Sequence, residues 1–253
     1  MTHIDLLDHS HLILVLTFFC LVQSVFGMGL LVFGTPTLII LNVPFVDCLL
    51  LLLPASLTIS LMQMGSIDYF RRLELGRSIP LLVGAVAVGF MVHILPLGPV
   101  RLEGLLGVVL FSYGLARMSA RIEAGAAAFV RDRTLSMTAA MGVLHGISNM
   151  GGAILAIISS SRYSDKNDLR TFVAANYAIL ATAQLIVLLL VLERWPIASV
   201  AASSAIAMSA YMLLGRRVYG AIGTRAFRHL FTAFIFMYSI ALLWKFLQHS
   251  SAA

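Results

Sequence analysis

Apolar residues in this chain occur in long continuous stretches rather than in the alternating pattern of a β-strand. A bilayer core needs about 20 apolar residues for each helical crossing, and a helix satisfies its own backbone hydrogen bonds there. The pattern therefore predicts an all-α, polytopic membrane protein. Six stretches have the length and composition of crossings: residues 44–64, 79–97, 102–116, 172–192, 196–214 and 229–247.

Two further apolar segments are interrupted near their middle. Residues 12–41 and 134–161 are 30 and 28 residues long, too long for a comfortable single crossing and too short for two. The first contains GMG at 27–29, and the second contains NMGG at 149–152. Each half has the length of a re-entrant segment, so we expect two broken hairpins that each enter and leave the membrane on one side.

The distribution of Lys and Arg tests this topology, because these residues accumulate on the cytoplasmic side of a membrane. If all eight apolar regions crossed, the two sides would hold eight and nine of the 17 basic residues. If both broken segments are re-entrant, 14 lie on one side and 3 on the other. The second topology follows the rule and predicts both termini on the outer side. Two long tilted helices with a weak charge bias are the alternative interpretation.

The chain also contains a weak internal repeat, with a shift of 121 to 126 residues. The shift aligns Gly29 with Gly152 and Gln63 with Gln184. A broken hairpin followed by three crossings in each half would place the halves in opposite orientations, as in many secondary transporters. The predicted units are a first repeat, a cytoplasmic linker and a second repeat, over residues 1–118, 119–133 and 134–253.

The two breaks are the predicted substrate site. A break frees backbone N–H and C=O groups, and each costs several kcal/mol in lipid unless protein, water or a ligand satisfies it. Glycine allows the turn and a close approach to the backbone. The helix that follows presents unpaired N–H groups and a positive dipole end, which suits an anion. These helix starts lie near Gly29 to Leu31 and Gly151 to Ala153.

Polar residues at and around the breaks are the candidate substrate contacts. Interhelical hydrogen bonding is the alternative for Gln63 and Gln184, and helix capping is the alternative for Ser148 and Asn149. A satisfied buried histidine is favoured over a proton carrier for His145. The complete predicted set is Gln23, Ser24, Gly27, Gly29, Gln63, His145, Ser148, Asn149, Gly151, Gly152, Asn176 and Gln184.

Composition excludes a soluble domain, since 60% of residues are hydrophobic, 11% are charged and the mean hydropathy is +0.97. The first eleven residues hold no Lys or Arg and end without a small-residue cleavage site, so we expect the first hydrophobic segment to be retained. Cys20 and Cys48 give neither a disulfide framework nor metal-ligand spacing. The net charge of +6 reflects topology, and no nucleic-acid partner is expected.

Residue types and motifs that the sequence lacks restrict the possible functions further. No acidic or basic residue sits clearly at mid-depth, which favours an anionic or neutral substrate held by amides, hydroxyls and helix ends. No motif of an ATPase, a serine hydrolase or a zincin is present, so we expect neither enzyme activity nor a cofactor. The N-terminal HIDLLDHSH could bind a metal, but chance composition is the preferred interpretation, and no metal site is predicted.

The segments GMGLLVFGTPTLIIL and HGISNMGGAILAI, which open the two halves, resemble the TauE/SafE family of sulfite and organosulfonate exporters. Members show a G-x-G-G-G run with a following proline in each half. Here Leu30 and Leu31 follow Gly29, Pro36 is kept, and Ser159 or its neighbours replace the second proline. The resemblance implies a secondary transporter of small sulfur-containing or other organic anions in the bacterial inner membrane. A non-transporting membrane helper or receptor is the alternative, and assembly into a homo-oligomer stays open.

The re-entrant topology places Asn42 and Ser164 on opposite sides of the membrane. With Cys20 and Cys48 replaced by alanine, Asn42→Cys and Ser164→Cys should react with a membrane-impermeant thiol reagent from opposite faces. Labelling of intact and permeabilised cells checks this expectation. Reaction of both cysteines from the same face would remove the inverted repeat.

Overall fold

The computed structural model describes residues 10–64, 78–91, 103–192 and 195–251, and every regular element within these ranges is a helix. The predicted first repeat contains α1 (Ser10–Phe26), α2 (Leu30–Ile40), α3 (Phe45–Gln63), α5 (Ser78–Met91) and α6 (Glu103–Ala116). The predicted linker contains α7 (Ala120–Asp132). The predicted second repeat contains α8 (Thr134–Ser148), α9 (Gly152–Arg162), α10 (Lys166–Val191), α11 (Ile197–Ala210), the π-helical turn η3 (Tyr211–Gly215), α12 (Arg216–Ala221) and α13 (Thr224–Ser251).

Both predicted interruptions lie between helices. Gly27 and Gly29, with φ of 77° and 130°, separate α1 from α2. Asn149 adopts the left-handed conformation, with φ of 61°, and ends α8. L side chains rarely adopt positive φ, while glycine and asparagine tolerate it best, so the residue types at these positions explain why the helices stop there.

Four of the described helices are long and apolar enough to cross a membrane: Phe45–Gln63, Lys166–Val191, Ile197–Ala221 and Thr224–Gln248. They correspond to four of the six predicted crossings. α5 and α6 have 14 residues each, a length of about 21 Å at 1.5 Å per residue, which is shorter than a bilayer core. The predicted segment 79–97 continues beyond the described residues. These two crossings and the re-entrant hairpins stay predictions.

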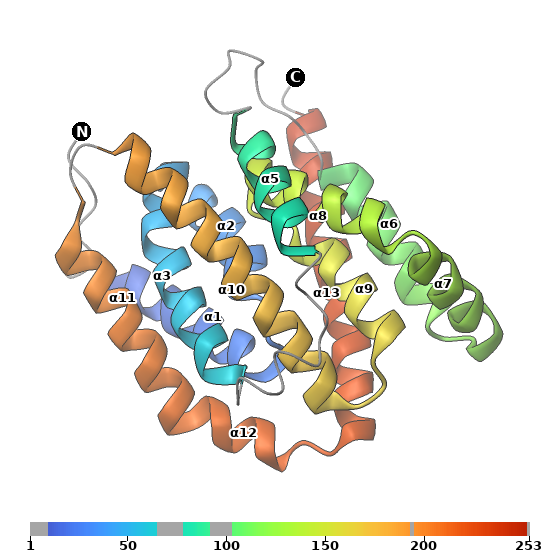
Figure 1. The fold of residues 1–253 in the computed structure, drawn as a ribbon. Coiled ribbons are helices and arrows are strands. Elements are labelled where there is room, and N and C mark those ends of the chain that lie inside the picture. The colour runs from blue at the N-terminus through green and yellow to red at the C-terminus, as the bar shows by residue number, and fades with distance from the viewer. Residues whose placement is uncertain (1–9, 65–77, 92–102, 193–194, 252–253) are drawn as a thin grey trace.

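The helices of the two halves interlock around α3 and α10. α3 packs against α10 and α11, and α10 also packs against α5 and α9 (Figure 1). α5 lies against α8, α6 against α13, and α1 against α11. One buried hydrophobic cluster runs through these contacts and includes Leu52, Val86, Leu155, Tyr177 and Phe231. Because both halves contribute to the same core, the two breaks are held inside one packed body.

Large apolar side chains also cover the outside of the helices. Leu14, Leu105, Leu190, Ile197 and Trp244 are each more than 60% exposed, and they come from five different helices. A water-soluble monomer rarely exposes so much contiguous apolar surface. The hydrocarbon core of a bilayer is the solvent that fits this surface, in agreement with the predicted membrane protein.

Residues 119–133, predicted as a linker, form the amphipathic helix α7. Its sequence ARIEAGAAAFVRD is rich in alanine, the strongest helix former, but too charged to cross a bilayer. Val130 is buried, and α7 packs mainly against α9. The predicted linker is therefore a helix that packs on the side of α9.

α5 and α8 approach each other closely at glycines, as helices in membranes commonly do. A Cβ added at Gly89 would overlap the backbone carbonyl group of Val143, whereas a Cβ at Gly84 on the same helix would meet nothing within 4 Å. Gly89→Ala should therefore lower stability by about 1–3 kcal/mol through overpacking. Gly84→Ala should leave it unchanged or raise it slightly, because alanine favours the helix. Thermal unfolding of the two purified variants checks this, and equal shifts would contradict it.

Candidate functional site

The side chain of Gln63, the last residue of α3, satisfies backbone carbonyls at the first break. Its Nε2 donates to the carbonyl oxygens of Gln23 and Ser24, at 2.9 Å each. Carbonyls in the last turn of a helix have no intrahelical donor, and in lipid they need another one. The Gly27 N–H also donates to the Gln23 carbonyl, at 2.8 Å. The end of α1 is thus closed by a side chain from α3.

The predicted contacts Gln23 and Ser24 are fully buried and bonded within the protein. Gln23 Nε2 donates to the Ser56 carbonyl and hydroxyl oxygens at 3.0 Å and to the Ser60 hydroxyl at 3.3 Å, while Gln23 Oε1 accepts from Ser56 Oγ at 3.2 Å. Ser24 Oγ donates to the Cys20 carbonyl at 2.7 Å. Gln23 therefore holds α1 to α3, and Ser24 bonds to the backbone of its own helix.

Arg170 adjoins the first break and is absent from the predicted set. Its Nη1 donates to the Ser24 carbonyl at 3.4 Å, and its guanidinium carbon lies 3.3 Å from the centroid of the Tyr219 ring. Its backbone oxygen and Cγ lie 3.1 and 3.2 Å from where a Cβ of Gly27 would be. Any side chain at Gly27 would therefore push Arg170 away from the break.

Arg170 comes to the break because α10 begins earlier than the predicted crossing at residue 172. The Asp165 side chain accepts from the backbone N–H groups of Asn167 and Asp168, which is an N-cap that starts the helix at Lys166. This cap is the sequence signal that could have placed Arg170 inside the helix. Instead, the predicted topology counted Arg170 among the flanking cytoplasmic charges.

Arg170 has no carboxylate partner among the described residues. The two ion pairs between described residues, Arg117 with Glu123 and Arg228 with Glu123, do not involve it. Its Nε is buried and lacks a hydrogen-bond acceptor within the described chain. A partly buried positive charge without a counter-charge is costly, and an anion is the ligand that offsets the cost.

The second break repeats the closure seen at the first. Gln184 Nε2 donates to the His145 carbonyl in the last turn of α8 at 3.1 Å, and the Asn149 N–H donates to the same oxygen at 2.8 Å. Ser148 Oγ donates to the Leu144 carbonyl at 2.8 Å and accepts from the Met150 N–H at 3.3 Å. Ser148 therefore bonds within the turn, and it does not cap α9, whose N-cap Gly151 has no side-chain hydrogen bond among the described residues.

The two breaks meet where α2 and α9 begin. Asn149 Nδ2 donates to Thr35 Oγ1 of α2 at 2.8 Å. A Cβ added at Gly152 would overlap both the Val32 side chain of α2 and the Tyr177 hydroxyl of α10. Asn176 is buried, but its Nδ2 donates to the Phe172 carbonyl of its own helix at 2.9 Å. The N-terminal turns of the two half-helices therefore adjoin, while Asn176 bonds away from them.

Buried polar atoms without a hydrogen-bond partner in the described chain gather around the breaks. A buried donor or acceptor that lacks a partner costs about 1–3 kcal/mol, so these atoms are available for a substrate. The His145 and Tyr177 rings meet edge to face, with centroids 6.1 Å apart. The atoms concerned are Oε1 of Gln63 and Gln184, Oδ1 of Asn149, both ring nitrogens of His145, Nε of Arg170 and the hydroxyl of Tyr177.

No group of three or more His, Cys, Asp or Glu side chains that could hold a metal occurs among the described residues. Most of the N-terminal HIDLLDHSH stretch lies outside them. The geometry at the breaks instead combines one guanidinium group, amide oxygens, a hydroxyl and an imidazole, all of which bind ligands through hydrogen bonds.

The chain matches the model of a known protein family. The model described as "Sulfite exporter TauE/SafE" matches residues 12–242, a range that includes both breaks and every predicted site residue. The resemblance stated from the two glycine segments is confirmed. Neither the curated proteins nor the solved structures contain a match to the chain.

The close contacts at Gly152 predict that a larger residue there lowers the stability of the protein. Gly152→Ala should destabilise the protein by about 1–3 kcal/mol, since the new methyl group overlaps Val32 and the Tyr177 hydroxyl. Adding Tyr177→Phe and Val32→Ala should restore part of the loss by making room. Gly125→Ala, at a position with nothing within 4 Å, is the matched control. Thermal unfolding of the four proteins measures this, and failure of the triple variant to recover stability would contradict the packing.

Proposed function

The chain belongs to the sulfite exporter TauE/SafE family, and we propose that it carries small sulfur-containing or other organic anions through a site between its two helix breaks. Family membership makes it a multi-pass membrane transporter. We further propose that the protein works by alternating access, that it lies in the bacterial inner membrane, and that both termini are on the outer side. No catalytic role is assigned to any residue.

The observation that carries the proposal is the guanidinium of Arg170, which lies at the first break and has no carboxylate partner among the described residues. Arg170 adjoins Gly27, three residues before α2 begins at Leu30, and the N-terminus of α2 carries partial positive charge. No side chain caps that N-terminus within the described residues. Two positive features meeting at one buried break favour a negatively charged substrate.

The position of the site along α10 supports binding between the breaks. Arg170 and Val173 adjoin Gly27, and Tyr177 adjoins Gly152. Residues 173 and 177 are one helical turn apart, about 6 Å at 1.5 Å per residue. A small anion placed there would reach groups from both breaks at once. The residues around it are buried, which fits a state closed to both sides of the membrane.

Pairwise helix contacts support the inverted repeat. Exchanging α1, α2, α3, α5 and α6 with α8, α9, α10, α11 and α13 converts the contact of α5 with α8 into that of α11 with α1. The same exchange converts α3 with α11 into α10 with α5, and it maps α3 with α10 and α6 with α13 onto themselves. Gln63 and Gln184, aligned by the sequence shift, donate to aligned carbonyls in α1 and α8. Alternating access would follow from rocking of one half against the other.

The test is transport by the purified protein in liposomes, with sulfite and a small alkylsulfonate as probes. Arg170→Gln should lower the transport rate about 10- to 100-fold, because a charge-assisted contact is lost. Arg170→Lys should recover only part of the rate, since lysine keeps the charge but not the stacked, forked geometry. Arg217→Gln, which removes an exposed arginine, should transport at the wild-type rate.

Asn149→Ala tests the second break in the same assay. It removes the bond to Thr35 and the unpartnered Oδ1, so transport should be abolished while membrane expression is retained. Full transport by both Asn149→Ala and Arg170→Gln would refute the site. Sulfite that is neither moved by the wild-type protein nor able to raise its melting temperature would favour the non-transporting helper instead.

A further inference from the structure

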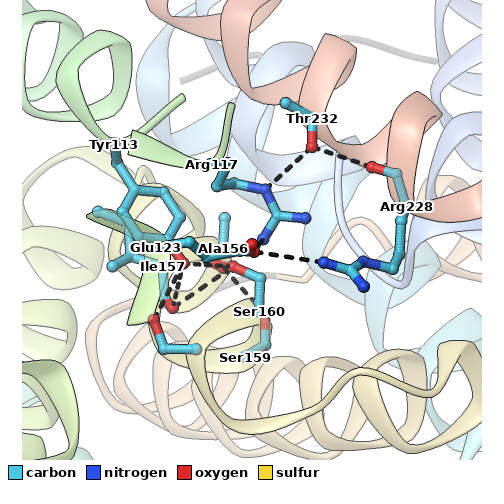
Figure 2. A network of polar contacts seen from close by, with 10 residues as sticks. Tyr113, Arg117, Glu123, Ala156, Ile157, Ser159, Ser160, Arg228 and Thr232 are labelled. Atoms are coloured by element: carbon cyan, nitrogen blue, oxygen red, sulfur yellow. Dashed lines mark hydrogen bonds and ion pairs between the residues drawn. The ribbon is translucent and has the colours of Figure 1, made fainter. Parts of the chain in front are cut away.

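A polar cavity of about 210 Å³ lies between α7, α9, the start of α10 and α13, with Arg117 just after α6, and its residues differ from those at the two breaks. Its walls include Arg117, Glu123, Ser160, Ser161 and Arg228. Figure 2 shows most of these side chains converging from separate helices. α7, the helix that replaces the predicted linker, closes one side of the cavity.

Two arginines share a single carboxylate in this cavity. Arg117 Nη1 and Arg228 Nη2 lie 3.6 and 3.5 Å from the same Glu123 Oε1 (Figure 2). No other charged side chain among the described residues lines the cavity, so the side chains there carry a net positive charge. The Arg117 side chain is only 4% exposed, and water therefore screens its charge poorly. Both ion pairs are longer than the 2.7–2.9 Å of a strong charge-assisted hydrogen bond.

Ser160 and Ser161 bring hydroxyl groups to the cavity where α9 ends. The Tyr113 hydroxyl lies 3.0 Å from Ser160 Oγ and 2.9 Å from Ser161 Oγ at the end of α9. The Arg117 Nε donates to Thr232 Oγ1 at 2.9 Å, which fixes the plane of its guanidinium group. The C-terminal end of α9 adds about half a negative charge, which the net charge of the side chains exceeds.

We propose that this cavity binds a small tetrahedral oxyanion, a phosphate or sulfate group held by Arg117 and Arg228 and by the Ser161 hydroxyl, because the Ser160 hydroxyl donates to the Ala156 carbonyl. Planar guanidinium groups match the oxygen geometry of such anions, and the hydroxyl completes the set of donors. The group can arrive as a free inorganic ion or as the phosphate of an anionic lipid headgroup. The site is separate from the transport site and does not depend on it.

The experiment uses the full-length protein in detergent, with inorganic sulfate as the probe and chloride at equal ionic strength as the reference. The measured quantity is the apparent sulfate affinity from the rise in melting temperature, taken relative to the baseline of each variant. All proteins carry Arg170→Gln, so that sulfate bound at the helix breaks does not contribute. The melting-temperature assay then reports on the cavity alone, and the transport assay reports on the site between the helix breaks.

Arg228→Gln should weaken the apparent sulfate affinity about 10- to 100-fold, since one charged donor is lost. Arg225→Gln, an exposed arginine one turn away on α13 and outside the cavity, should leave the affinity unchanged. Glu123→Gln should strengthen the affinity about 3- to 10-fold, because it removes the competing carboxylate. A purely structural cluster would instead lose stability in Glu123→Gln and gain no affinity for sulfate.

Equal effects of Arg228→Gln and Arg225→Gln, or a sulfate affinity that Glu123→Gln does not raise, would overturn the proposal. Nanodiscs of phosphatidylglycerol and of phosphatidylcholine distinguish the two sources of the anion. If sulfate raises the melting temperature in phosphatidylcholine but not in phosphatidylglycerol, the result supports a lipid headgroup as the source. An equal response in both lipids supports a free ion.

Discussion

The backbone groups freed at the two helix breaks impose the constraint on which the rest of the structure depends. In a hydrocarbon solvent these groups have no water to bond, so the protein must supply partners or the breaks cannot exist. Gln63 and Gln184 supply them by donating to carbonyls at the ends of α1 and α8. Each glutamine reaches its break only if its helix packs directly behind the hairpin. The central position of α3 and α10 therefore follows from the breaks they serve.

The two halves use this shared frame differently. At the first break Gln23 and Ser56 bond to each other, and at the second break the rings of His145 and Tyr177 meet edge to face. The first pair is fully bonded to the protein, whereas the imidazole nitrogens and hydroxyl of the second pair have no partner in the described chain. Arg170 also comes from the second half. The first half thus provides mostly structural bonds, while the second half provides most of the groups left free for a substrate.

The sequence predicted the breaks well because their cause is local. Glycines at 27 and 29 and an asparagine at 149 allow the positive φ angles that end the helices. The partners of Gln63 and Gln184 depend on packing between residues about 40 positions apart, which no local pattern contains. α7 was missed because charge interrupts its hydrophobic pattern, although its alanine content favours a helix. The position of Arg170 depends on Tyr219, a residue beyond the predicted crossing 196–214.

A count of basic residues does not separate those that mark the topology from those that have a role inside the protein. Fourteen of them fall on one side of the predicted topology, and in the count they are equivalent. The structure separates them by burial and by partner. Arg217 and Arg225 are exposed and carry the topological signal alone. The Arg117 side chain is buried and shares a carboxylate, while Arg170 is partly buried beside a helix break and has no carboxylate partner in the described part of the chain. A charge withdrawn from water without a counter-charge is the costly arrangement, so Arg170 and the cavity at Arg117 are the two places where we propose that a bound anion offsets this cost.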